Sequence, residues 1–158
     1  MKMDSLTVLR FAQWVFYSAL VVILLVSFAL FLQKLSPKLP SQASFTGKVY
    51  SLEVADTGVT RTRGLGERSA LCATCGMLFV FEKPGEYPFW MKGMHFPLDI
   101  VWLLQGTVVH IERSVPWEDQ QTVYRSGAAA DQVLELNATE AAPLAVGSSV
   151  LFSPTGQR

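Results

Sequence analysis

The sequence contains few residues of the kinds that most often bind metals or carry out catalysis. Among its 158 residues there are two cysteines and two histidines. A structural zinc site has four ligands, so it would need both cysteines together with both histidines or with carboxylates. The chain has no Gly-x-Ser-x-Gly sequence, no His-Glu-x-x-His sequence and no glycine-rich phosphate-binding loop. We therefore expect no metal and no cofactor, and the common hydrolase and nucleotide-binding motifs are excluded.

An excess of basic residues is also absent. The 13 Lys and Arg residues balance 13 Asp and Glu residues over the whole chain. From Phe45 to the C-terminus nine basic residues face twelve acidic ones, so this part is mildly acidic. A nucleic-acid surface needs a basic patch with aromatic side chains beside it. We therefore expect no nucleic-acid partner.

Long hydrophobic runs are limited to one segment near the N-terminus. Residues 15–32 contain no charged residue, and roughly 20 apolar residues suffice to cross the bilayer core. We interpret residues 11–32 as a transmembrane helix that acts as an uncleaved signal anchor. A cleaved secretory signal is the alternative, because Lys2 and Arg10 form a basic start and residues 41–43 resemble a cleavage site. The apolar run, however, exceeds the roughly 7–15 residues of a signal-peptide core.

This interpretation divides the chain into four parts. They are an N-terminal tail (1–10), the transmembrane helix (11–32), a tether with two prolines and three serines (33–44) and a domain (45–158). Basic residues flank the helix on both sides, so they do not decide its orientation. A short tail followed by one span and a domain favours a single-pass inner-membrane protein with a periplasmic domain. Secretion after signal cleavage is the alternative.

Beyond the tether, short apolar stretches alternate with turn residues. Residues 50–55 and 131–136 alternate apolar and polar side chains with period two, which predicts half-buried strands. Other segments predicted as strands are 76–81, 89–91, 98–104, 107–111, 123–124 and 148–152. Pro84-Gly85 predicts a turn, and residues 60–71 predict a short helix or an irregular basic segment. We expect a mainly β fold, a sandwich or barrel with one short helix.

Several sequence blocks resemble those of one prokaryotic family. In chain order they are Arg63-Gly64-Leu65, Glu67-Arg68, Gly76-Met77-Leu78-Phe79-Val80-Phe81, Phe89-Trp90-Met91-Lys92, Pro97-Leu98-Asp99-Ile100 and Val133-Leu134-Glu135-Leu136. They are similar to the successive blocks of the domain-of-unknown-function (DUF) family 192, over about residues 48–152. The resemblance implies a compact, mainly β domain of a jelly-roll-like double-sheet kind, often exported or membrane-tethered. It implies no biochemical activity.

The chain departs from this family pattern at two places. The family usually has methionine at the position of Gly66, and Asn-Thr at the positions of Gly93-Met94. A polar Asn-Thr pair beside Lys92 would extend a ligand-binding network. Its replacement by Gly93 and Met94 weakens the case for such a network here.

Cys72 and Cys75 form a C-x-x-C sequence with several possible roles. A redox pair would need its first cysteine at a helix N-terminus in a thioredoxin-like unit, but this pair leads into a predicted strand. A zinc site would need His95 and His110 or carboxylates as further ligands. We favour a small structural disulfide that braces the turn before Gly76, since disulfides persist outside the cytoplasm. Free thiols are the remaining alternative.

Six residues form the candidate ligand site: Arg63, Arg68, Trp90, Lys92, Asp99 and Glu135. In one interpretation they converge on a pocket, where guanidinium groups bind a carboxylate, phosphate or sugar hydroxyls and Trp90 provides a stacking face. In the other, Asp99 or Glu135 pairs with an arginine and holds a loop across the end of the barrel, and Trp90 belongs to the core.

We therefore expect a membrane-anchored extracytoplasmic binding or accessory module for a small polar or glycan-like envelope ligand. One alternative is an enzyme that uses Asp99 or Glu135 as general acid or base, after burial raises the carboxyl pKa. Another is a protein-interaction or assembly factor, for which Trp117 would be a contact. A concave site with a carboxylate away from every arginine would favour the enzyme, and a closed arginine–carboxylate pair would favour a structural role.

Overall fold

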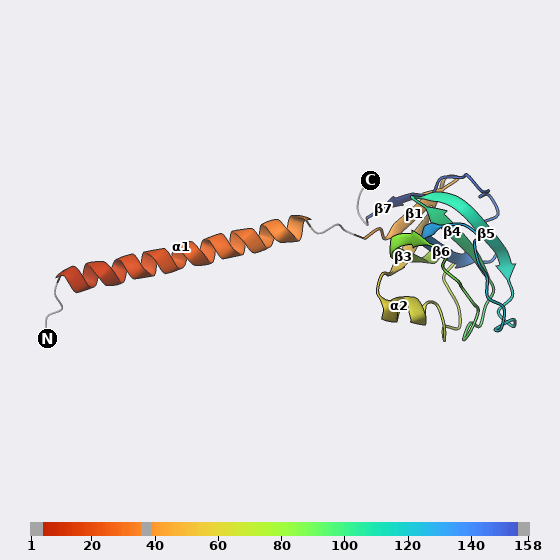
Figure 1. Ribbon diagram of the computed structural model, residues 1–158, viewed down its shortest axis with the longest axis horizontal. Helices are drawn as coiled ribbons and strands as arrows, with labels where there is room; N and C mark the ends of the chain where they lie inside the picture. The colour runs from red at the N-terminus through yellow and green to blue at the C-terminus, as the bar shows by residue number, and fades with distance from the viewer. Residues whose placement is uncertain (1–4, 36–38, 155–158) are drawn as a thin grey trace. The chain divides into compact units, whose positions relative to one another are not determined.

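The chain forms two separate units, shown in Figure 1. The structure, a computed structural model, describes residues 5–35 and 39–154, so parts of the predicted tail and tether lie outside the described residues. The first unit contains one helix, α1 (Ser5–Leu35). Its segment Gln13–Leu32 is long and apolar enough to cross a membrane. Length and composition fit either a membrane anchor or a signal sequence.

The second unit is built on a single seven-stranded sheet. Its strands are β1 (Gln42–Phe45), β2 (Lys48–Ala55), β3 (Cys75–Gly85), β4 (Leu98–Leu104), β5 (Thr107–Val115), β6 (Ala130–Asn137) and β7 (Leu151–Ser153). They lie in the order β5-β4-β6-β3-β2-β1-β7. Only the β2–β3 pair is parallel among these strands. The connection between these two strands carries the short helix α2 (Gly58–Arg63).

The sheet curls into a half-barrel, and its two edges meet at one point (Figure 1). Thr107, at the start of edge strand β5, makes an antiparallel bridge with Ser149, just before β7. The Val150 N–H donates to the Gly106 carbonyl at 2.9 Å. The predicted mainly β fold with one short helix is confirmed. A division into the two packed sheets of a jelly roll is not observed in the described part of the chain.

Each face of the sheet carries its own hydrophobic cluster, because successive strand residues point to opposite faces. What we call the first face includes the buried side chains Leu78, Val101 and Leu134. What we call the second face includes Phe79, Trp102 and Val133. The second face is covered by buried residues from outside the sheet, namely Leu65, Phe89, Met91 and Met94. A pocket can therefore form between the second face and this cover.

Most predicted strands are observed, with different ends. β3 continues through Pro84 to Gly85, where we expected a turn, and its register with β6 shifts between Val80 and Gly85. The shift explains how a proline is tolerated there, since it need not donate to a regular ladder. Residues 89–91 form no regular strand; Phe89 makes only an isolated bridge with Tyr124.

β1 was not predicted, because it begins inside the expected tether. It pairs with β2 through a two-residue turn at Thr46 and Gly47, whose φ angles are 48° and 80°. Positive φ at both central positions is typical of a type I′ hairpin turn. The Thr-Gly pair was therefore the available signal, and the sheet starts at Gln42, ahead of the first predicted strand.

A disulfide joins Cys72, in the loop between α2 and β3, to Cys75, the first residue of β3, with their Cα atoms 5.1 Å apart. The same loop is tied to the sheet by two hydrogen bonds. The Ser51 N–H donates to the Thr74 carbonyl at 2.8 Å, and Asn137 Nδ2 donates to the Cys72 carbonyl at 2.9 Å. No group of three or more His, Cys, Asp or Glu side chains placed to hold a metal occurs among the described residues.

We expect thiol labelling of the denatured, non-reduced protein to find no free cysteine. Reduction should lower the free energy of unfolding by about 2 kcal/mol, the chain-entropy value for so short a loop. Urea unfolding of the full chain in a nonionic detergent measures this change. A Cys72→Ser/Cys75→Ser variant should match the reduced protein and should not respond to reductant. Full labelling before reduction would contradict the disulfide.

Candidate functional site

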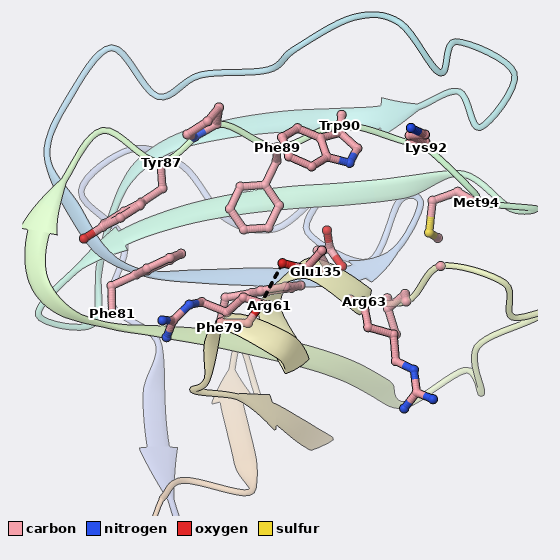
Figure 2. A pocket seen from close by; sticks show the side chains of 16 residues that line it. Arg61, Arg63, Phe79, Phe81, Tyr87, Phe89, Trp90, Lys92, Met94 and Glu135 are labelled. Carbon is pink, nitrogen blue, oxygen red and sulfur yellow. Dashed lines mark hydrogen bonds between the residues drawn. The ribbon is translucent and has the colours of Figure 1, made fainter.

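A pocket of about 300 Å³ lies between the second face of the sheet and its cover (Figure 2). One wall comes from α2 and the loop after it, and another from β3. The opposite wall is the segment 87–94, and Glu135 of β6 reaches the pocket from the sheet. Aromatic side chains from these elements dominate the lining: Phe79, Phe81, Tyr87, Phe89 and Trp90.

Local sequence determines where α2 begins and ends beside the pocket. Thr57 caps the helix by accepting the Thr60 N–H at 3.2 Å, and the Thr60 side chain in turn accepts the Thr57 N–H at 3.0 Å. This reciprocal pair is a capping box. The helix ends at Gly64, whose φ of 52° favours glycine. The chain then turns back, and Leu65 is buried in the second-face cluster.

The two departures from the family pattern lie next to each other in space. The Glu67 N–H donates to the Gly93 carbonyl at 2.7 Å. A Cβ atom on Gly66 would lie 3.7 Å from the Lys92 carbonyl oxygen and 3.1 Å from that of Arg63. The loop after α2 and the 87–94 segment therefore meet backbone to backbone at one end of the pocket, and the tightest contact of a Cβ at position 66 would be with the Arg63 carbonyl of its own loop.

The aromatic wall is held together by ring contacts and by Arg61. The rings of Phe81 and Tyr87 stack with centroids 3.5 Å apart, and the Arg61 guanidinium lies 5.1 Å from the Phe81 centroid. Arg61 Nη1 donates to the carbonyls of Asp56 and Val80, both at 2.7 Å. Arg61 thus ties α2 to β3 through the two N–H groups of its Nη1.

Glu135 is the one acidic residue among the described residues that line the pocket. It points to the second face because its cross-strand neighbours there are Ile100 on β4 and Met77 on β3. Only 6% of its surface is exposed, and its Oε2 has no hydrogen-bond partner among the described residues. Burial raises the pKa of this carboxyl to about 8. At neutral pH Glu135 is therefore mainly a protonated carboxylic acid that can donate a hydrogen bond.

Arg63, Trp90 and Lys92 also line the pocket. Trp90 is 48% exposed, so it is not a core residue. Figure 2 shows the Arg63 guanidinium turned away from Glu135. No ion pair of Arg63 or Lys92 occurs among residues 39–154. Four of the six candidate residues thus share one pocket, but the expected pairing of Glu135 with an arginine is not observed there.

Asp99 lies away from the pocket, contrary to our expectation. It is fully buried, and its two carboxyl oxygens accept the N–H groups of Ser114 and Ala141, both at 2.7 Å. The physical reason is strand alternation: Ile100 pairs with Glu135, so Asp99, one residue earlier, points to the first face. Asp99 pairs with backbone N–H groups rather than with an arginine.

Arg68 also lies outside the pocket lining. It forms a two-point pair with Glu53 on β2, with N–O distances of 2.5 and 2.9 Å. The Arg68 hydrogen bonds lower the pKa of Glu53. Because the Glu53 side chain is 58% exposed, this pair contributes at most about 1 kcal/mol to stability.

The residues that our sequence interpretation missed are four aromatic side chains, Phe79, Phe81, Tyr87 and Phe89. We had interpreted Phe79 and Phe81 only as parts of an apolar strand. A usable signal was the spacing of two within each pair, which places both rings of a pair on one side of an extended chain. That spacing does not tell which cavity the rings line.

Comparison with known proteins supports the fold. Residues 41–152 match the model of the DUF192 family, described as "Uncharacterized ACR". A protein of unknown function from Novosphingobium aromaticivorans is 29% identical, with a TM-score of 0.64 over 72% of this chain and 84% of that chain. A putative transcription regulator from Sinorhizobium meliloti is 25% identical, with a TM-score of 0.64 over 74% of this chain and 96% of that chain. Among curated proteins, none matches. The family match covers most of the length of this chain, so the chain belongs to the DUF192 family.

Proposed function

We propose that this protein is a membrane-anchored binding module whose pocket holds a small polar, glycan-like ligand of the cell envelope. One observation carries the proposal: the Glu135 carboxyl, 6% exposed, lines an aromatic pocket and leaves Oε2 without a partner among the described residues. Buried polar atoms in native proteins are almost always hydrogen-bonded. A carboxyl oxygen left unpaired beside a cavity therefore indicates a partner that comes from outside the chain.

The composition of the pocket favours a ligand with both apolar faces and polar edges. Five aromatic residues line it, and Trp90 is half exposed at its mouth. A sugar ring presents C–H faces to such rings and hydroxyls at its edge. These hydroxyls can bond to Glu135 inside and to the side chains of Arg63 and Lys92 at the rim. Apolar pockets with a few convergent polar groups are the usual form of small-molecule sites.

The location of the domain is part of the proposal. An uncleaved α1 would anchor it at the inner membrane with the domain in the periplasm, and a cleaved one would release it. The Cys72–Cys75 disulfide supports an oxidising compartment. The intact mass of the protein purified from membranes separates the anchored from the cleaved form, because cleavage removes the whole apolar segment.

A second candidate, an enzyme with Glu135 as general acid, is favoured by one observation. The carboxyl is held near pKa 8 in a concave site and pairs with no described arginine. Asp99 cannot share this role, because it lies on the opposite face of the sheet. Most glycoside hydrolases use two carboxylates around the scissile bond, and Glu135 is the one acidic side chain lining this pocket among the residues that the structure describes. We therefore favour binding over glycoside cleavage.

The other functional interpretations have less support. Trp117, our candidate contact for an assembly factor, is partly buried against the second-face cluster. A role in transcription regulation, as in the description of the Sinorhizobium meliloti protein, does not fit the mildly acidic balance of residues 45–158. We extend neither role to this chain.

Thermal-shift screening of the full chain in a nonionic detergent tests the proposal against envelope sugars and small metabolites. We expect at least one class to raise the Tm, since a ligand that binds only the folded state stabilises it. Trp90→Ala should abolish the shift, and Arg68→Gln, outside the pocket, should preserve it. Product formation from a stabilising compound, lost in Glu135→Gln, would favour the enzyme. The absence of any stabilising class would count against the binding module.

A further inference from the structure

We infer that the ligand of this pocket carries a protonated amine, which pairs with Glu135, so that amino sugars and related alkylammonium compounds are the class recognised. This inference rests on the proposed binding function and narrows it. A small polar ligand of any charge would satisfy the proposed function. Only a ligand that places a positive charge inside the pocket agrees with the narrower inference.

The chain places a carboxyl in an apolar site and supplies no cation to it from the described residues. Burial is the only cause that acts on the pKa of Glu135, so no neighbouring positive charge offsets it. Arg61, the basic residue of the wall, gives its Nη1 to the carbonyls of Asp56 and Val80. A buried carboxylate is stabilised by an opposite charge within roughly 4–6 Å. A ligand ammonium group beside the Glu135 carboxyl would supply that charge and a hydrogen-bond donor.

The aromatic side chains of the lining are suited to contact the parts of a bound ammonium group that do not face Glu135. Figure 2 shows Phe89 and Trp90 on one side of Glu135 and Phe79 on the other. Aromatic faces attract cations, and aromatic cages are a recurrent means of binding alkylammonium groups. The chain uses the same attraction itself, where the Arg61 guanidinium lies 5.1 Å from the Phe81 centroid.

The other basic residues do not occupy the place of the amine. Arg63 and Lys92 line the pocket but are exposed, and the Arg63 guanidinium points away from Glu135 in Figure 2. They can meet hydroxyls or an anionic substituent of the same ligand at the rim. An anion without an amine would bind at the rim alone and would leave Oε2 of Glu135 unpaired.

When Glu135 pairs with a ligand ammonium group, the number of bound protons changes, and this change can be measured. Near neutral pH Glu135 holds a proton, which must leave for solvent when the carboxylate pairs with an ammonium, and the ammonium keeps its own protons. The other titratable groups that line the pocket are Arg61 and Arg63 from the α2 region and Tyr87 and Lys92 from the opposite wall. We expect amine binding to release about one proton per ligand below pH 8 and to tighten as the pH rises towards 8.

The test is calorimetric titration of the full chain in a nonionic detergent with two matched pairs of probes. Glucosamine carries an ammonium group where N-acetylglucosamine carries a neutral amide, and choline and 3,3-dimethyl-1-butanol differ only in the quaternary nitrogen. At pH 6.5 we expect one charged member to bind about tenfold or more tightly than its neutral partner, as an interaction with a charged group provides. Its titration in two buffers of different ionisation enthalpy should reveal the released proton.

Variants separate this inference from the proposed function. Glu135→Gln should remove both the preference for the charged probe and the proton release, while Arg68→Gln, outside the pocket lining, should leave both unchanged. Equal binding of charged and neutral members overturns the amine inference and leaves the binding module standing. Binding of inorganic phosphate but of neither amine also overturns it, in favour of an anion site at the rim. If no probe binds and no compound in the thermal-shift screen stabilises the protein, both proposals fail.

Discussion

Glu135→Gln is expected to make the protein more stable than the wild type at pH 9 and about equally stable at pH 4. The cause is the burial of the Glu135 carboxyl, 6% exposed, which raises its pKa from 4.5 to about 8. Glutamine has nearly the same shape and never ionises. The variant therefore keeps the packing of the site and removes the cost of a buried charge.

The direction of the effect follows from proton binding in the two states. Between pH 4.5 and about 8 the folded protein keeps the Glu135 proton and the unfolded chain has lost it. The folded state thus binds more protons, so the wild-type free energy of unfolding falls as the pH rises through this window. At about 1.4 kcal/mol per pH unit, the total loss reaches up to about 5 kcal/mol above pH 8.

Urea unfolding of the full chain in a nonionic detergent, followed by near-UV circular dichroism at pH 4, 7 and 9, measures this difference. Glu53→Gln is the matched control, because the pKa of Glu53 is lowered by Arg68 and its side chain is 58% exposed. A lowered pKa gives stability that is present at neutral pH and lost in acid, so this variant should be slightly less stable at pH 7, by less than about 1 kcal/mol. Parallel pH profiles of wild type and Glu135→Gln would show that Glu135 is not buried as described.

Period-two alternation predicted the strands because it is a local property of the chain. β2 and β6 lie where the alternation in residues 50–55 and 131–136 indicated. The closing of the curl depends on Thr107 meeting Ser149, a contact between distant residues that no local pattern contains. The number of sheets was therefore beyond the reach of the sequence pattern, whereas the predominance of strands was not.

The candidate site shows the same division. Lys92, Asp99 and Glu135 are all charged residues in apolar surroundings, and nothing local separates them. Register separates them: Ile100 lies opposite Glu135 and Asp99 lies opposite Leu136, so the two carboxyls face opposite sides of the sheet. A shift of one residue would exchange their roles. The sequence could therefore identify the unusual residues but could not assign them to one site.

Asp99→Asn is expected to lower the free energy of unfolding by about 3 kcal/mol, because it removes an acceptor for a buried backbone N–H. Between the pairs Leu98↔Val115 and Ile100↔Glu112, Asp99 faces two residues of β5. This is a β-bulge, and Ser114 in it has a φ of 47°. Asp99 Oδ1 accepts the N–H of Ser114, and Oδ2 accepts that of Ala141. An asparagine has one acceptor oxygen for these two donors.

A second interaction makes the surroundings of Asp99 costly to rearrange. Arg113, also in the bulge, donates to the carbonyls of Ala141 and Leu144 at 2.6 and 2.5 Å. Asp99 and Arg113 together hold the turn after β6 against the first-face cluster, in which Ala141 and Leu144 are buried. In the Asp99→Asn variant the side-chain amide would direct its own N–H at a backbone N–H donor. If the turn moved to separate these two donors, the apolar side chains of Ala141 and Leu144 would become exposed.

Asp131→Asn is the matched control, since Asp131 Oδ1 accepts a single exposed N–H, that of Gln105 at 2.9 Å, and asparagine keeps an oxygen for it. We expect this control to cost less than about 1 kcal/mol. Asp99→Asn should nevertheless bind any pocket ligand with unchanged Kd at a temperature where it is folded, because Asp99 lies on the other face of the sheet. A folded Asp99→Asn protein that has lost ligand binding would contradict this separation, and unfolding curves that match those of Asp131→Asn would contradict the buried hydrogen bonds.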